Sequence, residues 1–375
     1  MTQRLRVALL FGGRSAEHDV SLLSAGNVFR ALDPAKYEVV PIAITRDGVW
    51  LLCEPVDGAF PASVPASGPR VALLPGGGGR YLVMPAADGG AAPRTNDDAT
   101  PRTGAVDVLF PVLHGPFGED GTVQGAAELA GVAYVGSDVL GSAVAMDKDV
   151  AKRLLRDAGL PMTRFLVFTA PDTPSFDTVL EQLGRPVFVK PARLGSSVGV
   201  GKAGSAEEFD AAVREAFRHD RKILVEAFVA GREVECGVLE NPDGSLFVSV
   251  PGEIVPTNRH RFYTYEAKYL DDDGAELKVP ADLPAATAQR VRDLSALAFR
   301  ALGCAGLARI DFFVGPDGAV LINEVNTMPG FTSISMYPMA LTASGVSYPE
   351  IVERLLAHAL QRAGRRPATE TAPPH

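Results

Sequence analysis

Short apolar runs, separated by turns and a polar helix, open the chain. Residues 7–11 read Val-Ala-Leu-Leu-Phe and stop at two glycines, residues 21–31 have helical spacing, and residues 37–44 form the next apolar run. Runs that are apolar on both faces are typical of strands buried in a parallel sheet. Strand, helix and strand in this order begin an α/β unit, so the pattern predicts an open α/β domain at the N-terminus.

Similar patterns recur along the rest of the chain. They predict helices at 122–130, 147–158 and 348–361, a helix from the capping box Ser205-Ala-Glu-Glu208 to residue 217, and strands at 106–114, 186–190 and 223–228. From Glu233 the pattern is strand-rich. Strands and helices therefore alternate in a second α/β segment, and the chain becomes α+β toward its C-terminal part.

Three segments lack such a pattern. Residues 55–104 are rich in Pro, Gly, Ala and Asp, and predict an irregular excursion that contains one short hairpin, 71–74 with 81–84. Residues 256–273 are polar, aromatic and charged, which predicts a long functional loop or lid. Residues 364–375 predict a disordered tail.

Polar side chains stand on a hairpin predicted from residues 308–311 and 322–326, joined by the turn Gly315-Pro-Asp-Gly318. If the loop between the strands has an even residue count, Arg309 lies opposite Glu324 and Asp311 opposite Ile322. Arg309, Asp311, Glu324 and Asn326 then share one face, together with Phe313, Val320 and Ile322. Two carboxylates and an amide oxygen suit Mg²⁺, and the guanidinium suits a phosphoryl group or an oxyanion. The alternative is a solvated surface hairpin with an ordinary ion pair, which the apolar neighbours on both faces make the poorer interpretation.

Composition and charge narrow the class of protein. The chain has 375 residues, 46% of them hydrophobic, and a formal net charge of −9 without a long Lys/Arg run. This argues against nucleic acid or an anionic membrane as the main partner. The three cysteines are scattered and lack metal-ligand spacing, and neither a signal peptide nor a membrane-length apolar run is present, so we expect a cytoplasmic protein.

A Gly/Ser loop at 195–201 follows the strand that ends at Lys190, and can direct several N–H groups at a phosphate. The loop does not match the P-loop motif. Gly199-x-Gly-x-x-Gly204 does match the dinucleotide-binding motif, but this signal is weak because the loop from Lys190 is too long for the tight strand–turn–helix of such a site. The alternative is a flexible loop without a ligand; Lys190, at the end of an apolar strand, favours an anion. Lys148 is a second phosphate candidate, although a solvated helix lysine is more common.

Other candidate binding residues cannot be assigned a role from their local sequence alone. The strand at 223–229 followed by Glu233 could hold adenine and ribose, but a plain strand end is equally consistent. Glu17 follows the first strand, where α/β sheets bind ligands, yet it could be a helix-start acid facing water. His114 could be a capped loop histidine.

Together these segments resemble the D-alanine–D-alanine ligases of the ATP-grasp superfamily over nearly the whole chain. The motifs that carry the resemblance are Phe11-Gly-Gly-Arg-Ser-Ala-Glu-His-Asp-Val-Ser21, His114-Gly-Pro-Phe-Gly-Glu-Asp-Gly121, Met146-Asp-Lys148, Lys190-Pro-Ala-Arg-Leu-Gly-Ser-Ser-Val-Gly199, Tyr265-Glu-Ala-Lys-Tyr269, Arg309-Ile-Asp311 and Asn323-Glu-Val-Asn-Thr-Met-Pro-Gly330. The resemblance implies an ATP-grasp fold with an N-terminal domain at 1–140, a central subdomain at 141–232 and a C-terminal subdomain at 233–363.

The resemblance also implies roles for individual residues. Two Mg²⁺ ions, which Mn²⁺ can replace, would be held by Asp311, Glu324 and Asn326. ATP would be bound by Lys148, Lys190, Ser196, Ser197, Glu226, Val229 and Glu233. Glu17, His114, Lys268 and Ser335 would bind the D-alanine substrates. Arg309 and the Gly330 N–H would stabilise the oxyanion. The lid would be closed by hydrogen bonds that link Glu17, Ser196 and Tyr269.

The implied reaction joins two D-alanines through a D-alanyl phosphate, for peptidoglycan precursor synthesis, in a protein that the family suggests is a homodimer. The alternatives are another ATP-grasp ligase, for instance one that makes D-alanyl-D-lactate, and a non-enzymatic ATP-binding module. The non-enzymatic module is disfavoured by the combination of Arg309 with Asp311, Glu324 and Asn326. Nucleotide binding alone needs no oxyanion donor, which is the role expected of Arg309.

Overall fold

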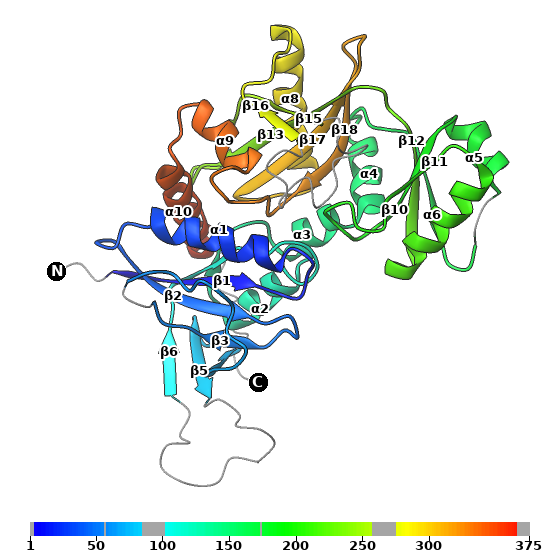
Figure 1. The fold of residues 1–375 in the computed structure, drawn as a ribbon. Coiled ribbons are helices and arrows are strands. Elements are labelled where there is room, and N and C mark those ends of the chain that lie inside the picture. The colour runs from blue at the N-terminus through cyan, green and yellow to red at the C-terminus, as the bar shows by residue number, and fades with distance from the viewer. Residues whose placement is uncertain (1–3, 56–57, 85–101, 173–174, 257–274, 366–375) are drawn as a thin grey trace, which may run out of the picture.

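The structure is a computed structural model that describes residues 4–55, 58–84, 102–172, 175–256 and 275–365. Three β-sheets organise these residues, and helices pack against each of them (Figure 1). No helix of the described ranges is both long and apolar enough to cross a membrane.

The N-terminal sheet has eight strands in the order β6-β5-β4-β3-β2-β1-β7-β8. Its strands are β1 (Leu5–Gly12), β2 (Tyr37–Ile44), β3 (Trp50–Leu52), β4 (Arg70–Leu73), β5 (Arg80–Met84), β6 (Arg102–Ala105), β7 (Val108–Pro111) and β8 (Ala133–Tyr134). Strands β2, β1, β7 and β8 run parallel, which confirms the predicted α/β start. β1 is apolar throughout because both its faces are covered: Leu9 packs with α1 (His18–Ala31) and α10 (Tyr348–Arg365), and Leu10 packs with α2 (Thr122–Ala130).

The hairpin predicted in the excursion is confirmed, because β4 pairs antiparallel with β5. β6 then pairs with β5, and β4 pairs with β3, so these strands continue the main sheet to its edge. The prediction of an irregular excursion outside the hairpin is therefore wrong for residues 102–104, which belong to β6. The reason is that one edge of the parallel sheet remained open for antiparallel strands to add to it.

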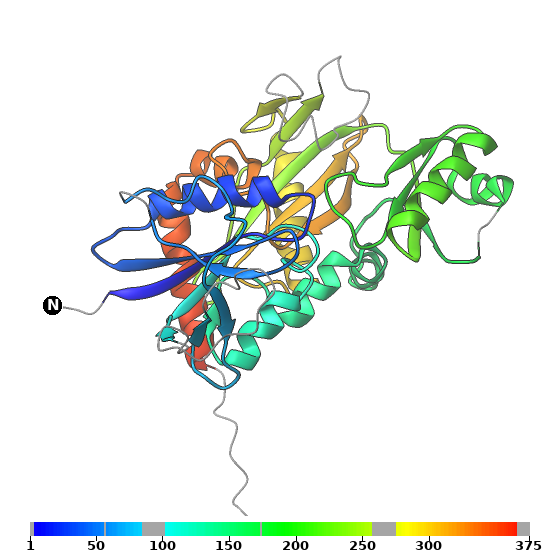
Figure 2. The same ribbon diagram turned by 60° about the horizontal axis from the view of Figure 1, so that its bottom comes forward.

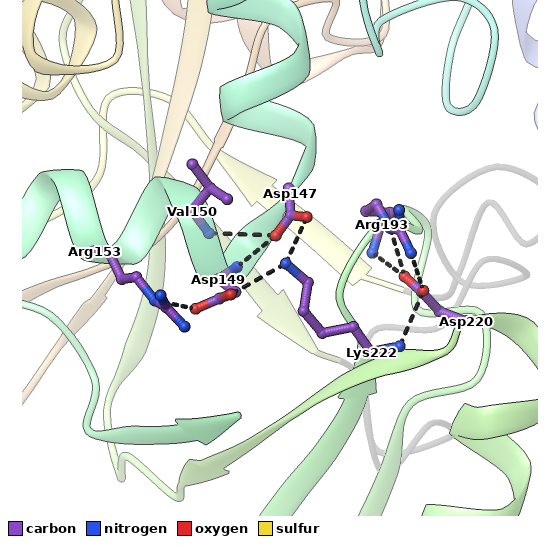
Figure 3. Close-up of polar contacts among 7 residues, drawn as sticks. All are labelled: Asp147, Asp149, Val150, Arg153, Arg193, Asp220 and Lys222. Atoms are coloured by element: carbon purple, nitrogen blue, oxygen red, sulfur yellow. Dashed lines mark hydrogen bonds and ion pairs between the residues drawn. The ribbon is translucent and has the colours of Figure 1, made fainter. Parts of the chain in front are cut away.

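Two helices lead from this sheet into the rest of the chain, α3 (Val139–Met146) and α4 (Lys148–Asp157). The helix predicted at 147–158 is confirmed as α4, whereas α3 was not predicted. Asp147 caps α4: its carboxylate accepts from the Val150 N–H at 3.2 Å and pairs with Lys222 at 2.7 Å (Figure 3).

The second sheet has four antiparallel strands in the order β11-β10-β12-β9. They are β9 (Phe165–Thr169), β10 (Val187–Pro191), β11 (Gly201–Ala203) and β12 (Lys222–Ala227). Helices α5 (Phe176–Leu183) and α6 (Ala206–His219) cover the face that carries Val187, Val189 and Val225. The capping box is confirmed at its N-cap, since the Ser205 hydroxyl accepts from the Glu208 N–H at 3.3 Å.

The third sheet follows the path β16-β15-β13-β17-β18, and β14 also pairs with β13. Its strands are β13 (Arg232–Glu240), β14 (Leu246–Val248), β15 (Gly252–Pro256), β16 (Ala275–Lys278), β17 (Leu307–Val314) and β18 (Val320–Asn326). Helix α8 (Ala285–Ala301) packs on the face of Val234, Ile310 and Ile322. Helix α9 (Met336–Ala343) contacts β13 and leads to α10, which packs in the core of the N-terminal sheet.

The predicted hairpin is present as β17 and β18, but its register is not the predicted one. Arg309 pairs with Asn326 and Asp311 with Glu324, and a β-bulge at Asn323 then shifts the pairing so that Phe312 lies opposite Ile322. The four polar residues do share one face, as predicted. Val320 and Ile322, however, lie on the opposite face in the core, because the extra residue reverses the alternation beyond it.

The second sheet, with α5 and α6, stands apart from the rest of the molecule in both views (Figures 1 and 2). It is joined to the rest through α4, through the loop after β10, and through the passage from β12 to β13. The helix-free faces of the second and third sheets contribute the residues of the cavity described next.

Candidate functional site

A cavity of about 450 Å³ lies between the second and third sheets. From the second sheet it is lined by Phe188, Lys190, Lys202 and Glu226, which alternate onto the face that α5 and α6 leave free. From the third sheet it is lined by Glu233, Glu235, Asp311, Phe313 and Glu324. Both sheets thus turn charged faces toward each other and apolar faces toward helices.

The charged face of the third sheet carries a row of carboxylates across three strands. Glu235 pairs with Asp311, and Asp311 pairs with Glu324, so the three stand side by side on β13, β17 and β18. The Arg309 guanidinium bonds both Asp311 oxygens, at 2.7 and 2.8 Å, and its Nε lies 3.0 Å from Glu235. Arg309 and Asp311 are buried, so the paired charges compensate each other's loss of water.

Asn326 occupies the same face but a different environment. Its side-chain oxygen accepts from the Met328 N–H at 3.1 Å and does not line the cavity. In the described ranges no three His, Cys, Asp or Glu side chains form a group that could hold a metal ion. Asp311 and Glu324, with the Asn326 amide, fit a hard cation that takes one or two carboxylates and completes its shell with phosphate oxygens, as Mg²⁺ does.

Two of the predicted phosphate ligands, Lys148 and Lys190, line the cavity. Lys148, at the start of α4, donates to the Leu194 carbonyl at 2.6 Å and lies 3.6 Å from Glu324. Lys190, on β10, lies 2.9 Å from Glu226 and donates to Asn323, the bulge residue, at 3.4 Å. The bulge therefore also brings Asn323 into the site.

The loop after β10 borders the cavity through Ser196 and Ser197. Both have left-handed backbone conformations, with φ of 52° and 59°. Such a conformation is uncommon for residues other than Gly, Asn and Asp, and turns the chain sharply. The turn brings the Ser196 hydroxyl to Glu17, to which it donates a hydrogen bond.

The predicted base and ribose residues, Glu226, Val229 and Glu233, all line the cavity. Phe188 and Phe228 stack with ring centroids 6.1 Å apart, and the Lys202 ammonium lies 4.8 Å from the Phe228 ring. An apolar wall beside acceptor groups of the backbone and of Glu226 suits a flat heteroaromatic base.

Glu17 and His114 lie on loops that follow β1 and β7, and the charges of Glu17 and Arg309 both act on the His114 imidazole. The His114 imidazole donates from Nδ1 to the Met328 carbonyl at 2.8 Å, and Nε2 lies 3.5 Å from the Ser24 hydroxyl. Burial lowers the pKa of His114 below its ordinary value and outweighs the attraction of Glu17. The ring is therefore neutral near pH 7, with the Nδ1–H fixed by the carbonyl.

The remaining predicted site residues are Gly330, Ser335, Lys268 and Tyr269. Gly330 is buried in the loop between β18 and α9. The Ser335 hydroxyl lies 2.7 Å from that of Thr332. Lys268 and Tyr269, and most of the predicted lid at 256–273, lie outside the described residues.

Four residues at the site were not predicted from the sequence. They are Glu235, Lys152, Asn323 and Glu119. Glu119 accepts from the Gly115 N–H at 2.7 Å, and burial, with the nearby charge of Glu17, raises its pKa to about 8. Its position inside the His114–Gly121 motif was a usable signal; Lys152 and Glu235 had none, because single charges in a helix or strand are ordinary.

Models of one protein family match the chain. The model described as D-ala D-ala ligase N-terminus matches residues 6–137, and that described as D-ala D-ala ligase C-terminus matches residues 154–357. A D-alanine--D-alanine ligase A of Mesorhizobium japonicum is 56% identical over 362 residues, which cover 96% of this chain and 99% of that protein. A D-alanine--D-alanine ligase of Mycolicibacterium vanbaalenii is 48% identical over 376 residues, with 96% and 99% covered.

Solved structures agree with this fold. The D-alanine-D-alanine ligase of Coxiella burnetii superposes with a TM-score of 0.82 at 34% identity, covering 97% of this chain and 96% of that one. The VanG D-Ala:D-Ser ligase of Enterococcus faecalis superposes with a TM-score of 0.80, also at 34% identity, covering 95% and 100%. The similar structures thus include a ligase named for D-serine as its second amino acid.

Proposed function

We infer the function of this chain from one premise: it belongs to the D-alanine–D-alanine ligase family. It uses ATP to join two D-alanine molecules into D-alanyl-D-alanine, a precursor for peptidoglycan, and releases ADP. The observation that supports this most directly is the Arg309–Asp311–Glu324 group beside a cavity that two lysines and a hydroxyl-bearing loop border. The site thus combines anion binding with an oxyanion donor.

ATP would lie in the cavity between the two sheets. Glu226 and Val229 would meet adenine, Glu233 the ribose, and Lys148, Lys190, Ser196 and Ser197 the phosphates. Asp311, Glu324 and Asn326 would hold two Mg²⁺ ions, which Mn²⁺ can replace. When bound, the divalent ions neutralise phosphate charge and orient the γ-phosphoryl group.

The first D-alanine would bind near Glu17 and His114, with its ammonium facing the Glu17 carboxylate. Its own carboxylate attacks the γ-phosphorus, which gives D-alanyl phosphate and ADP. A carboxylate is a poor electrophile, and phosphorylation supplies it with a leaving group. The neutral His114 adds no positive charge that would compete for the Glu17 carboxylate.

The second D-alanine then attacks the acyl carbon through its deprotonated amine, and phosphate leaves. Arg309 and the Gly330 N–H would stabilise the tetrahedral oxyanion. Lys268 and Ser335 would hold the second carboxylate, and Tyr269 would complete the closure that Ser196 and Glu17 begin. We also propose the division into domains at 1–140, 141–232 and 233–363, a homodimer, and a cytoplasmic location.

The identity of the second amino acid distinguishes this function from related ones, because one of the similar structures is a D-Ala:D-Ser ligase. We expect ADP release with D-alanine alone, and D-alanyl-D-alanine as the main product when D-serine or D-lactate is added in equal amount. ADP release that required D-serine or D-lactate would assign the chain to another ligase. ADP release unaffected by any of the three would contradict a ligase altogether.

Replacement of Glu324 by glutamine tests the metal assignment. Loss of one charge beside two divalent ions should lower turnover at least about 1,000-fold, since such a charge is worth several kcal/mol at a site of low dielectric. The matched control is Asp317→Asn, an exposed acid in the turn of the same hairpin, which should keep wild-type turnover. A folded Glu324→Gln protein with wild-type ADP release would refute the assignment.

A further inference from the structure

Lys152, on α4, is a lysine buried behind the cavity. Its side chain is 2% exposed, and its ammonium lies 3.2 Å from one oxygen of Glu226. The other oxygen of Glu226 lies 2.9 Å from Lys190. Glu226 and Lys190 line the cavity, whereas Lys152 does not, so Lys152 reaches a ligand there only through Glu226.

Lys152 joins α4 to β12 through its ion pair with Glu226, and its ammonium lies 5.6 Å from the centroid of the Phe165 ring. Its Nζ faces one Glu226 oxygen at 3.2 Å, and among the described residues neither atom has a hydrogen-bond partner apart from the other. A buried ion pair is commonly no more stabilising than an apolar pair of the same volume. What Lys152 does provide is an ammonium group behind a carboxylate whose other side faces the cavity. Burial lowers the pKa of this ammonium group, and the Glu226 carboxylate counteracts that effect.

We propose that Lys152 is a positioning residue for nucleobase recognition: it holds the Glu226 carboxylate in place, so that Lys190 can leave it for the phosphates and the freed oxygen can accept the exocyclic amino group of adenine. This inference rests on the proposed function, because it assumes that ATP occupies the cavity. It adds a residue outside the cavity that determines which purine is bound.

The charges of the three side chains support the exchange. Burial alone would raise the pKa of Glu226, but the ammonium groups of Lys152 and Lys190 outweigh it and hold the pKa below its ordinary value. When Lys190 turns to a phosphate, Lys152 is still there to keep the carboxylate ionised. Without Lys152, release of Lys190 would leave a buried carboxylate without a counter-ion.

An ionised and fixed Glu226 discriminates between purines. Adenine carries an amino donor at position 6, whereas guanine carries a carbonyl oxygen there, which a carboxylate repels. If Glu226 took up a proton instead, it could donate to the guanine oxygen as well as accept from adenine. Loss of Lys152 should therefore weaken ATP binding and narrow the preference for ATP over GTP.

The test is calorimetric titration of the full-length protein with Mg-ATP and with Mg-GTP, without D-alanine. In Lys152→Met we expect the ratio of the two dissociation constants to fall about tenfold or more, the range of a hydrogen bond to a charged group. The matched control is Lys222→Met. Lys222 also links β12 to α4, through Asp147 at 2.7 Å and Asp149 at 3.1 Å, but does not line the cavity (Figure 3).

Lys222→Met should keep the wild-type ratio even if its melting temperature falls. A wild-type ratio in Lys152→Met, or an equal loss in both variants, overturns the inference, since Lys152 would then serve packing alone. If Lys152→Met does not fold, Lys152→Met combined with Glu226→Gln replaces both buried charges, and retained selectivity in that protein overturns the inference equally. Wild-type protein that binds neither nucleotide would refute the proposed function, an outcome distinct from these.

Discussion

Glu119 shows how one buried side chain responds to its neighbours. Its carboxyl group is buried away from water and lies near the charge of Glu17, and both effects raise its pKa. The hydrogen bond that it accepts from the Gly115 N–H lowers the pKa but offsets these effects only in part. Its pKa is raised to about 8, so it is largely protonated at neutral pH, whereas in the unfolded chain it titrates near 4.5. The folded state therefore binds a proton that the unfolded state releases.

This difference predicts how stability depends on pH. Between about 4.5 and about 8 the folded state holds more protons than the unfolded state, so the free energy of unfolding falls as pH rises through this window. Glu119→Gln cannot titrate and should lack that decline, and relative to wild type it should gain up to a few kcal/mol above pH 8. Denaturant unfolding of both proteins at pH 5, 7 and 8.5 measures it. Parallel stability curves would contradict the raised pKa.

Glu235 presents a different case, a carboxylate that holds an arginine. Asp311 is bonded by Arg309 here, and it is also a proposed metal ligand, so its oxygens would turn partly away from the guanidinium when a cation binds. Glu235, 3.0 Å from Arg309 Nε, would then keep the guanidinium in place.

Glu235→Gln should accordingly lower turnover roughly 10- to 100-fold, because displacement of a catalytic group by about 1 Å costs that much. The affinity for nucleotide should change little. Glu253→Gln is the control, since Glu253 pairs with Arg232 in the same sheet at 2.6 Å but does not line the cavity. Steady-state kinetics of both variants decide the matter: equal losses of turnover would mean that sheet stability, not Arg309, is at stake.

At the scale of elements, the bulge at Asn323 allows one strand to serve two purposes. On one side of it Val320 and Ile322 face the core, and on the other Glu324 and Asn326 face away from it toward the site. A regular strand cannot change the face of its side chains in this way. The extra residue therefore separates the part of β18 that stabilises the sheet from the part that carries chemistry.

Deletion of Asn323 should be far more damaging than its replacement. With the bulge gone, either Glu324 enters the core or Ile322 leaves it, and a buried unpaired carboxylate costs at least about 3 kcal/mol. Asn323→Ala keeps the residue count and should lose about 1 kcal/mol or less with the bond from Lys190. Denaturation midpoints of the two proteins compare them. Equal stability would show that the strand tolerates a register shift.

The sequence predicted the elements whose patterns are local and left out those set by tertiary contacts. Strands such as β1 and β2, which are covered on both faces, are apolar throughout and were recognised. The helices α3, α5, α8 and α9 were not predicted, and neither was the bulge, because an extra strand residue appears only when the partner strand is known. The prediction that four polar residues share one face is correct although the predicted register is wrong; these residues are Arg309, Asp311, Glu324 and Asn326. A shift of two residues in the pairing of β17 with β18 leaves every side chain on the same face.

At the scale of the whole molecule, three parts of the chain meet at one site. The loop after β1 brings Glu17, the loop after β10 brings Ser196, and the third sheet brings Arg309 and the carboxylates. The hydrogen bond from Ser196 to Glu17 joins residues 179 positions apart, and it links the N-terminal sheet to the second sheet directly. The second sheet projects from the rest of the molecule (Figure 2), and its other contacts include the bond from Lys190 to Asn323 of the third sheet.

This link predicts how tightly ATP use is coupled to product. An acyl phosphate hydrolyses if water reaches it, so closure of the parts around the site protects the intermediate. Ser196→Ala removes the hydroxyl that bonds Glu17 while leaving the carboxylates and Arg309 in place. We expect the ratio of ADP released to dipeptide formed to rise above one, because some of the intermediate is lost to water before the second D-alanine attacks.

Simultaneous measurement of ADP and D-alanyl-D-alanine gives this ratio without reference to the absolute rate. Ser205→Ala is the matched control: it removes a serine hydroxyl from the same unit, the N-cap of α6, which is remote from Glu17 and does not line the cavity. It should lower stability by about 1 kcal/mol, yet keep the ratio at one. A Ser196→Ala protein that is slower but still forms one dipeptide per ADP would mean that the Ser196–Glu17 bond orients substrate without excluding water, and that closure depends on other contacts.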